Sequence, residues 1–164
     1  MGVKRLKQHG KAGSEMAQQI AALPFLWDNK DRLRVLMVTS RQTRRWIMPK
    51  GWLMDGKKPW HAAKIEALEE AGAVGFVSDR ALGFYHYQKR LEDQSQLPCR
   101  VTVYPMMVDK LKRRWKERQE RTRRWFSLRK AAKLVDEPEL TALLEQLAKN
   151  PEQLTAVEHM REAS

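Results

Sequence analysis

The sequence has few of the features that mark disulfide-bonded or membrane proteins. It contains a single cysteine, Cys99, among 164 residues; this excludes an internal disulfide and favours a reducing, cytoplasmic location. No apolar run reaches the roughly 18 residues that a membrane-spanning helix needs. The first 15 residues are basic, but no apolar segment follows them. We therefore expect neither a signal peptide nor a membrane partner.

Acidic residues are outnumbered by basic ones. The chain has 32 lysines and arginines against 20 aspartates and glutamates, a formal net charge of +12. Such an excess favours an anionic partner, whether nucleic acid, anionic lipid or a small polyphosphate. The length indicates one domain of ordinary size. We expect a flexible basic arm at residues 1–15, a single domain at residues 16–150, and a tail or short helix at residues 151–164.

Apolar segments predict strands on both sides of one strong helix. Residues 17–27 and 34–40 are joined by a polar turn and are expected to form a hairpin, with Pro24 indicating an edge or a bulge. Residues 100–109 alternate and are expected to form a further strand. The basic run at residues 110–124 fits either a charged helix or a solvent loop. After Pro138, leucines at helical spacing predict an amphipathic helix.

The strong helix lies within residues 49–73, PKGWLMDGKKPWHAAKIEALEEAGA. Pro59 suits a first helical turn, and Gly72 suits a C-terminal cap. Ile65 and Leu68 share one face, which we expect to anchor the helix to a core. Three carboxylates share another face through spacings of three and four: Glu66, Glu69 and Glu70. Carboxylates this close repel one another unless a cation lies between them, and oxygen ligands suit Mg²⁺.

This stretch resembles the Nudix box, whose pattern is G, five residues, E, seven residues, then R-E-U-x-E-E-x-G-U, with U an aliphatic residue. Gly51 and Gly72 match the two glycines, and the three glutamates match R-E and E-E. Two positions depart, because Lys57 stands where the first glutamate is expected and Ile65 where the arginine is expected. The flanking segments ALPFLW, VLMVTSR, RRWIMPKG and RRWFSLRKA are similar in order to those of the diphosphoinositol and diadenosine polyphosphate phosphohydrolases.

The resemblance implies an α/β fold, the Nudix α/β/α sandwich with a mixed central sheet and the box as loop, helix and loop. It also implies a hydrolase in which water attacks a diphosphate bond of a small polyphosphate substrate. The implied cofactor is Mg²⁺, with Mn²⁺ as a substitute. Such a reaction needs no covalent intermediate, so the lack of a nucleophilic serine or cysteine motif is no objection.

The resemblance also implies roles for particular residues. Glu66, Glu69 and Glu70 are the catalytic and metal-binding carboxylates, and Glu66 serves as ligand, as general base, or as both. A carbonyl at Lys50 or Gly51 completes part of the shell. An acidic residue before the last strand is expected as a further metal ligand, with Glu120 the first choice and Glu117 the second. The expected phosphate-binding residues are Ser40, Arg41, Arg45 and Lys50.

Two other functions remain open from the sequence. One is an RNA 5′-end pyrophosphohydrolase, which would use both the box and the basic surface. The other is a catalytically impaired Nudix-like domain that binds nucleic acid or nucleotides. The departures at Lys57 and Ile65 fit either the joint replacement of a structural pair or a decayed site. The chain is expected to be a monomer or a homodimer.

Overall fold

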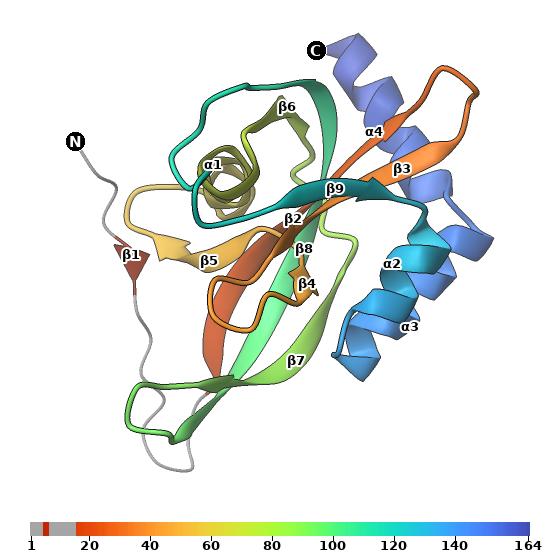
Figure 1. Ribbon diagram of the computed structural model, residues 1–164. Coiled ribbons are helices and arrows are strands. Elements are labelled where there is room, and N and C mark those ends of the chain that lie inside the picture. The colour runs from red at the N-terminus through yellow and green to blue at the C-terminus, as the bar shows by residue number, and fades with distance from the viewer. Residues whose placement is uncertain (1–4, 7–15) are drawn as a thin grey trace.

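The computed structural model of the chain describes residues 5–6 and 16–164 (Figure 1). In chain order the elements are β1 (Arg5–Leu6), β2 (Ala17–Trp27), β3 (Leu33–Thr39), β4 (Trp46–Ile47), β5 (Lys50–Met54), α1 (Pro59–Ala71), β6 (Ala73–Val77), β7 (Gly83–Arg90), β8 (Gln96–Leu111), β9 (Arg123–Phe126), α2 (Leu128–Leu134), α3 (Pro138–Lys149) and α4 (Glu152–Ala163).

The sheet is built around two long parallel strands, β2 and β8. Ala17 to Phe25 pair in register with Cys99 to Met107. Strands β3 and β5 pair antiparallel with β2, whereas β6 and β7 pair antiparallel with β8. The expected hairpin of residues 17–27 and 34–40 is therefore confirmed as β2 and β3, and the sheet is mixed as the sequence predicted.

Two prolines lie in these central strands, at the points where the outer strands part. The N–H of Ala22 donates to Pro49 O at 3.0 Å, so the nitrogen of Pro24, two residues on, faces the same side. There, β5 pairs only up to Ala21 and β3 only from Phe25. Pro105 faces the corresponding gap between β6 and β7. The expectation of an edge or bulge at Pro24 was wrong, because β2 is a central strand that pairs without interruption with β8. Proline is tolerated there because its nitrogen, which has no hydrogen to donate, faces the gap between β5 and β3.

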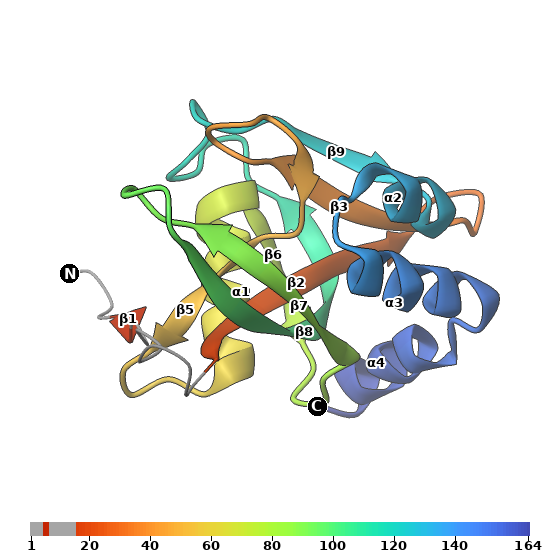
Figure 2. The ribbon, with the colours of Figure 1, turned by 90° about the horizontal axis from the view of Figure 1, so that it is seen from below.

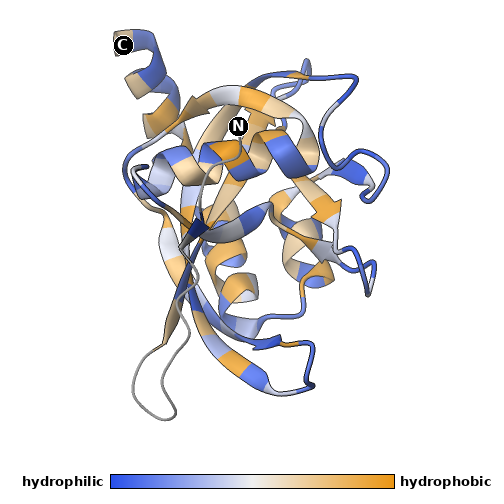
Figure 3. Cartoon of the chain, turned by 90° about the vertical axis from the view of Figure 1, so that its left-hand side faces the viewer, coloured by the Kyte–Doolittle hydropathy of each residue, from blue (hydrophilic) through white to orange (hydrophobic). Residues whose placement is uncertain are grey.

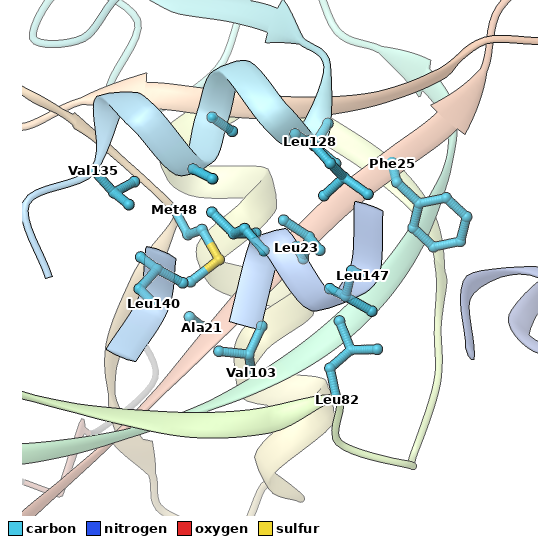
Figure 4. Close-up of a cluster of buried hydrophobic side chains, with 14 of the residues drawn as sticks. Ala21, Leu23, Phe25, Met48, Leu82, Val103, Leu128, Val135, Leu140 and Leu147 are labelled. Carbon is cyan, nitrogen blue, oxygen red and sulfur yellow. The ribbon is translucent and has the colours of Figure 1, made fainter. Parts of the chain in front are cut away.

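Helices cover both faces of the sheet and complete the predicted α/β/α sandwich (Figure 2). Alternate residues of β2 point to opposite faces. Leu23 and Phe25 pack with leucines of α2, α3 and α4 in one core cluster, which Figure 4 shows in close-up. Ile20 and Ala22 pack with alanines of α1 in the other. The loops at the periphery are mostly hydrophilic (Figure 3).

Helix α1 approaches the sheet through small side chains. It begins at Pro59 and ends at Gly72, which adopts φ 65° and donates its N–H to Leu68 O. Its buried face consists of four alanines and two glutamates: Ala62, Ala63, Glu66, Ala67, Glu70 and Ala71. Ile65 packs half-buried against the neighbouring core cluster as expected. Leu68 does not anchor the helix, because it points away from this face and is 38% exposed.

The two ends of the chain and the basic run also take defined places. Strand β1 falls within the predicted arm, and the rest of that prediction concerns residues outside those described. The C-terminal stretch forms helix α4, which buries Leu154 and Val157. Within the basic run of residues 110–124, residues 112–122 form a loop as one alternative predicted, whereas its two ends belong to β8 and β9. Among the described residues, no helix is long and apolar enough to cross a membrane.

The packing predicts very different costs for two leucines. Leu144→Ala, in the core beneath α3, is expected to lower the free energy of unfolding by about 2–5 kcal/mol because it removes a fully buried side chain. Leu68→Ala, on the exposed side of α1, is the matched control and should cost less than about 1 kcal/mol. Urea unfolding followed by circular dichroism measures both, and equal costs would contradict the assigned orientation of α1.

Candidate metal and phosphate site

Two carboxylates of α1 are buried against the backbone of β5. Glu66 and Glu70 are each 4% exposed and lie one helical turn apart. A Cβ atom built on Gly51 would lie 1.5 Å from Glu66 Oε2, so only glycine lets this carboxylate approach the strand. The N–H of Lys50 donates to Glu70 Oε1 at 3.4 Å. The carboxylates of both glutamates therefore lie close to the Lys50–Gly51 backbone.

Burial makes both carboxylates costly to ionise. Desolvation raises the pKa of Glu66, and the negative charges of Glu69 and Glu117 raise it further, while Arg5 opposes the shift. Desolvation likewise raises the pKa of Glu70, with Arg121 opposing it and Glu66 adding to it. Two buried carboxyl groups with raised pKa values on one face are typical of a functional site, and a bound cation would stabilise both anions.

Cationic side chains from distant segments surround the helix face. Arg5 Nη2 donates to Glu66 Oε1 at 3.0 Å and to Glu69 Oε1 at 2.5 Å. Lys116 Nζ lies 3.5 Å from Glu69 Oε2. Arg121 Nη2 lies 3.6 Å from Glu70 Oε1. These cations partly balance the three charges that the helix concentrates here.

The loop of residues 112–122 wraps around the C-terminal end of α1 (Figure 1). The N–H of Lys112 donates to Gly72 O at 2.7 Å, and that of Glu117 donates to Glu69 O at 3.0 Å. Trp115 Nε1 donates to Glu70 O at 3.0 Å. These bonds satisfy carbonyl groups that a helix end leaves without partners. The basic run is thus fixed to the box helix and contributes side chains to its acidic face.

The two candidates for a further carboxylate lie in different surroundings. The side chain of Glu120 is 49% exposed, and its Oε1 lies 3.7 Å from Arg41. The side chain of Glu117 is 15% exposed and accepts from Arg121 at 2.8 Å. Because Arg121 also reaches Glu70, the structure brings the second choice, Glu117, next to the box carboxylates, whereas Glu120 lies on the surface near Arg41.

The four predicted phosphate-binding residues divide into separate groups. Lys50 lies beside the carboxylates, and its Nζ donates to Tyr87 Oη at 2.9 Å. Burial lowers the pKa of this lysine. Ser40 Oγ accepts from the N–H of Arg45 at 3.1 Å and closes its own turn. The guanidinium of Arg45 pairs with Glu137 at 2.7 Å, and Arg41 lies at the surface with Glu120. Of the four, only Lys50 lies directly beside the box carboxylates.

Arg121 links these groups. Its side chain is 7% exposed and donates from Nη1 to Thr39 O at 3.0 Å, while its other nitrogens face Glu117 and Glu70. The residues before Ser40 are thereby held to the box helix through one buried guanidinium. Arg45 is held to the N-terminal end of α3 instead, through Glu137.

The donor set fits a hard divalent cation that keeps open positions. In the part of the chain that the structure describes, no three histidine, cysteine, aspartate or glutamate side chains form a ready-made metal cluster. Mg²⁺ is usually held by one or two carboxylates and completes its shell with water and substrate phosphate. Glu66, Glu70 and a carbonyl of the Lys50–Gly51 segment supply oxygen donors of that kind.

Several residues of this site could not be identified from the sequence. Arg5 is one of many basic residues in the N-terminal arm, and Arg121 is one of many in the basic run. Tyr87, whose hydroxyl donates to Gln19 Oε1 at 2.7 Å, lies in a strand that has no motif. The sequence indicated Glu117 only through its position between the box and the last strand, and Glu120 has the same property.

Known proteins share sequence and fold with this chain. A profile of the NUDIX domain matches residues 17–147. Nudix hydrolase 12, mitochondrial, of Arabidopsis thaliana is 32% identical over 110 residues, which cover 65% of this chain and 54% of that protein. Diphosphoinositol polyphosphate phosphohydrolase 3-alpha of Homo sapiens is 32% identical over 121 residues, covering 72% and 68%. The chain thus spans about half the length of the first of these relatives.

A solved structure shows the same fold. The crystal structure of the C. elegans Ap4A hydrolase superposes with a TM-score of 0.59 at 16% identity, covering 82% of this chain and 98% of that one. At this identity the likeness concerns the fold alone.

The buried carboxylate of Glu70 predicts a stability that depends on pH. In the folded state the pKa of Glu70 is raised from its ordinary value of 4.5 to about 8. Between pH 4.5 and about pH 8 the folded state therefore binds more protons than the unfolded state. Stability is therefore lost as pH rises through this window. Glu70→Gln removes the charge at constant shape, so we expect it to raise the free energy of unfolding of the metal-free protein by about 1–2 kcal/mol near pH 8.

Urea unfolding in the presence of a chelator, near pH 5 and near pH 8, measures this difference. The gain from Glu70→Gln should be small at the lower pH, where the wild-type carboxyl is already protonated in the folded state. Glu139→Gln on the exposed start of α3 is the matched control and should not show a gain that grows with pH. A loss of stability in Glu70→Gln at the higher pH would contradict the assignment of a buried charge that Arg121 compensates only in part.

Proposed function

The chain belongs to the NUDIX domain family, and on that premise we propose that it is a Mg²⁺-dependent pyrophosphohydrolase that cleaves a diphosphate bond in a small polyphosphate substrate by attack of water. One observation carries the proposal. Glu66 and Glu70 are buried side by side against the Lys50–Gly51 backbone, where ionised carboxylates are costly unless a cation accompanies them.

The residues of the box take distinct roles in this proposal. Glu66 and Glu70 hold the cation, and Glu117 is the further carboxylate best placed to join them. When bound, Mg²⁺ or Mn²⁺ would neutralise negative charge on the substrate phosphates and lower the pKa of the water that it binds. Glu69 is the most exposed of the three box carboxylates, with 20% of its side chain accessible. On this ground we propose that Glu69 is the box carboxylate that contacts the attacking water.

Basic residues near the carboxylates provide the substrate side of the site. Of the four predicted phosphate-binding residues, Lys50 lies closest to the carboxylates and carries its charge beside Tyr87. Arg41 is exposed and is free to turn toward a substrate, whereas Ser40 and Arg45 shape the loop that presents it. We propose that Lys50 and Arg41 bind the substrate phosphates that the metal does not contact, with Ser40 and Arg45 supporting them. Guanidinium groups suit this task because they bind phosphate oxygens in pairs.

The substrate class follows from the relatives and from charge. The human relative is named for diphosphoinositol polyphosphates and the C. elegans structure for Ap4A. Both names describe highly anionic molecules, and the +12 charge of this chain suits such a substrate. We propose that the substrate belongs to this class of compact polyphosphates. The cytoplasmic location and the choice between monomer and homodimer stay predictions; the Arabidopsis relative is named as mitochondrial.

An RNA 5′ end is the second candidate substrate, and one feature of the surface favours it. Arg113, Arg114 and Arg118 line a hollow of about 380 Å³ on the loop that wraps α1. The described part of the chain offers none of these three arginines an ion-pair partner. These arginines could bind the backbone phosphates of an RNA that extends beyond the metal site.

A panel assay distinguishes these substrates. Purified protein with Mg²⁺ is incubated with diadenosine polyphosphates, diphosphoinositol polyphosphates, nucleoside triphosphates and 5′-triphosphate RNA, and released phosphate or nucleotide is measured. We expect turnover of at least one compact polyphosphate that stops when metal is chelated. Absence of turnover across the panel, together with salt-sensitive RNA binding, would favour a binding domain instead of an enzyme.

Glu70→Gln tests the assignment of the site within the same assay. It keeps the shape of the side chain but removes an anionic oxygen donor, so we expect turnover to fall by about 100-fold or more. Glu139→Gln, with its carboxylate paired only to His86 on the surface, should retain the wild-type rate. A Glu70→Gln variant with wild-type turnover would show that the metal binds elsewhere.

A further inference from the structure

The N-terminal strand places one guanidinium on two box carboxylates at once. Strand β1 pairs antiparallel with β5, with Arg5 opposite Met54 and Leu6 opposite Leu53 (Figure 1). A single nitrogen of Arg5, Nη2, donates to Oε1 of both Glu66 and Glu69. The side chain of Arg5 is 28% exposed, so these bonds are partly shielded from water.

Arg5 binds the outer oxygen of Glu66 and leaves the inner one turned toward the strand. Glu66 Oε2 is the oxygen that approaches Gly51, and Glu66 Oε1 is the one that Arg5 holds. The proposed cation position lies on the Gly51 side, between Glu66 and Glu70. Among the contacts of described residues, Arg5 reaches Glu66 and Glu69 and does not reach Glu70. Its guanidinium therefore lies beside the cation position and not in it.

Helix α1 has no cation of its own for this task. Its one lysine, Lys64, and its one histidine, His61, are both exposed on the outer surface. Ile65, where the box pattern has arginine, packs against the apolar cluster between α1 and the sheet. Lys57 is exposed in the preceding turn. Three carboxylates within five residues repel one another, so their orientation depends on groups from other segments.

The other cations near this face each contact one box carboxylate. Among the box carboxylates, Lys116 contacts only Glu69 and Arg121 contacts only Glu70. The shorter contact of Arg121 is with Glu117, which lies outside the box. Arg5 is the group that ties Glu66 to Glu69 in the described structure. Fixing one oxygen of a metal-binding carboxylate through a hydrogen bond sets the direction of the other and raises metal affinity.

We propose that Arg5 is a positioning residue of the metal site, supplied by the N-terminal strand in place of the arginine that the box lacks at Ile65. It holds the outer oxygens of Glu66 and Glu69 and thereby aims the inner oxygen of Glu66 at the Gly51 backbone. This inference rests on the proposed metal-binding function. It adds that Arg5, which precedes the start of the NUDIX profile match at residue 17, is part of the working site.

Metal binding in the absence of substrate tests the proposal. Mn²⁺ is titrated into the full chain and followed by isothermal calorimetry and by loss of the free Mn²⁺ signal in electron paramagnetic resonance. We expect Arg5→Ala to weaken Mn²⁺ binding by about 10- to 100-fold, the range typical of lost supporting bonds to metal ligands. Arg5→Lys should recover much of this loss, because a single nitrogen makes both bonds and an ammonium group can do the same.

Lys116→Gln is the matched control, since it removes one positive charge near Glu69 without freeing either Oε1. It should change the affinity by less than about 3-fold, in the direction of tighter binding because repulsion of the cation falls. Thermal melts in the presence of a chelator confirm that each variant is folded. A loss in Arg5→Ala alone, recovered by Arg5→Lys, supports a positioning role that charge by itself would not produce.

Other results overturn the inference in distinguishable ways. Tighter Mn²⁺ binding in Arg5→Ala would make Arg5 a competitor that occupies the cation position. Unchanged binding would make the Arg5 contacts incidental to the site. If the wild-type chain binds no Mn²⁺ at all, the proposed function itself fails, and this inference falls with it.

Discussion

The arrangement depends on two carboxylates buried where a helix meets a strand. Glu66 and Glu70 stand among the alanines of α1 on the face that packs against the sheet. Placing them there is costly, because each loses water and each repels the other. The cost has to be offset, and the cation proposed at the Lys50–Gly51 backbone would offset it most directly. In the proposed function, the same burial that costs stability is what favours binding of the cation.

The rest of the chain is arranged to make that burial feasible. Alanines bring α1 close to β2 and β5, and Gly51 leaves room for a carboxylate oxygen at the strand. The loop of residues 112–122 then closes over the end of α1 and delivers Arg121 and Glu117. Two prolines at the strand divergences let β2 and β8 remain central without unpaired donors. Each of these features serves the position of one helix face.

The sequence predicted what local spacing determines and missed what distant segments contribute. The helix, its glycine cap and its glutamates follow from a period of 3.6 and from turn chemistry. Leu68 was misassigned because hydrophobicity alone does not reveal that small residues make the buried face. Arg5 and Arg121 had no periodic signal, since their roles arise from contacts 61 and 51 positions away along the chain, with Glu66 and Glu70 respectively. Glu120 and Glu117 could not be separated until the loop was placed.

The structure also bears on why the box departs from its pattern at two positions. A decayed site would leave the glutamates with unbalanced charge or replace them, yet all three remain and each faces a cation from another segment. Ile65 adds apolar contact to the core cluster, and Lys57 is exposed where it disturbs nothing. Loss of an arginine that had a glutamate partner is least costly when both change together and another cation takes over the carboxylates. On the proposal that Arg5 supports the acidic face, joint replacement of a structural pair is the interpretation of both departures that we favour.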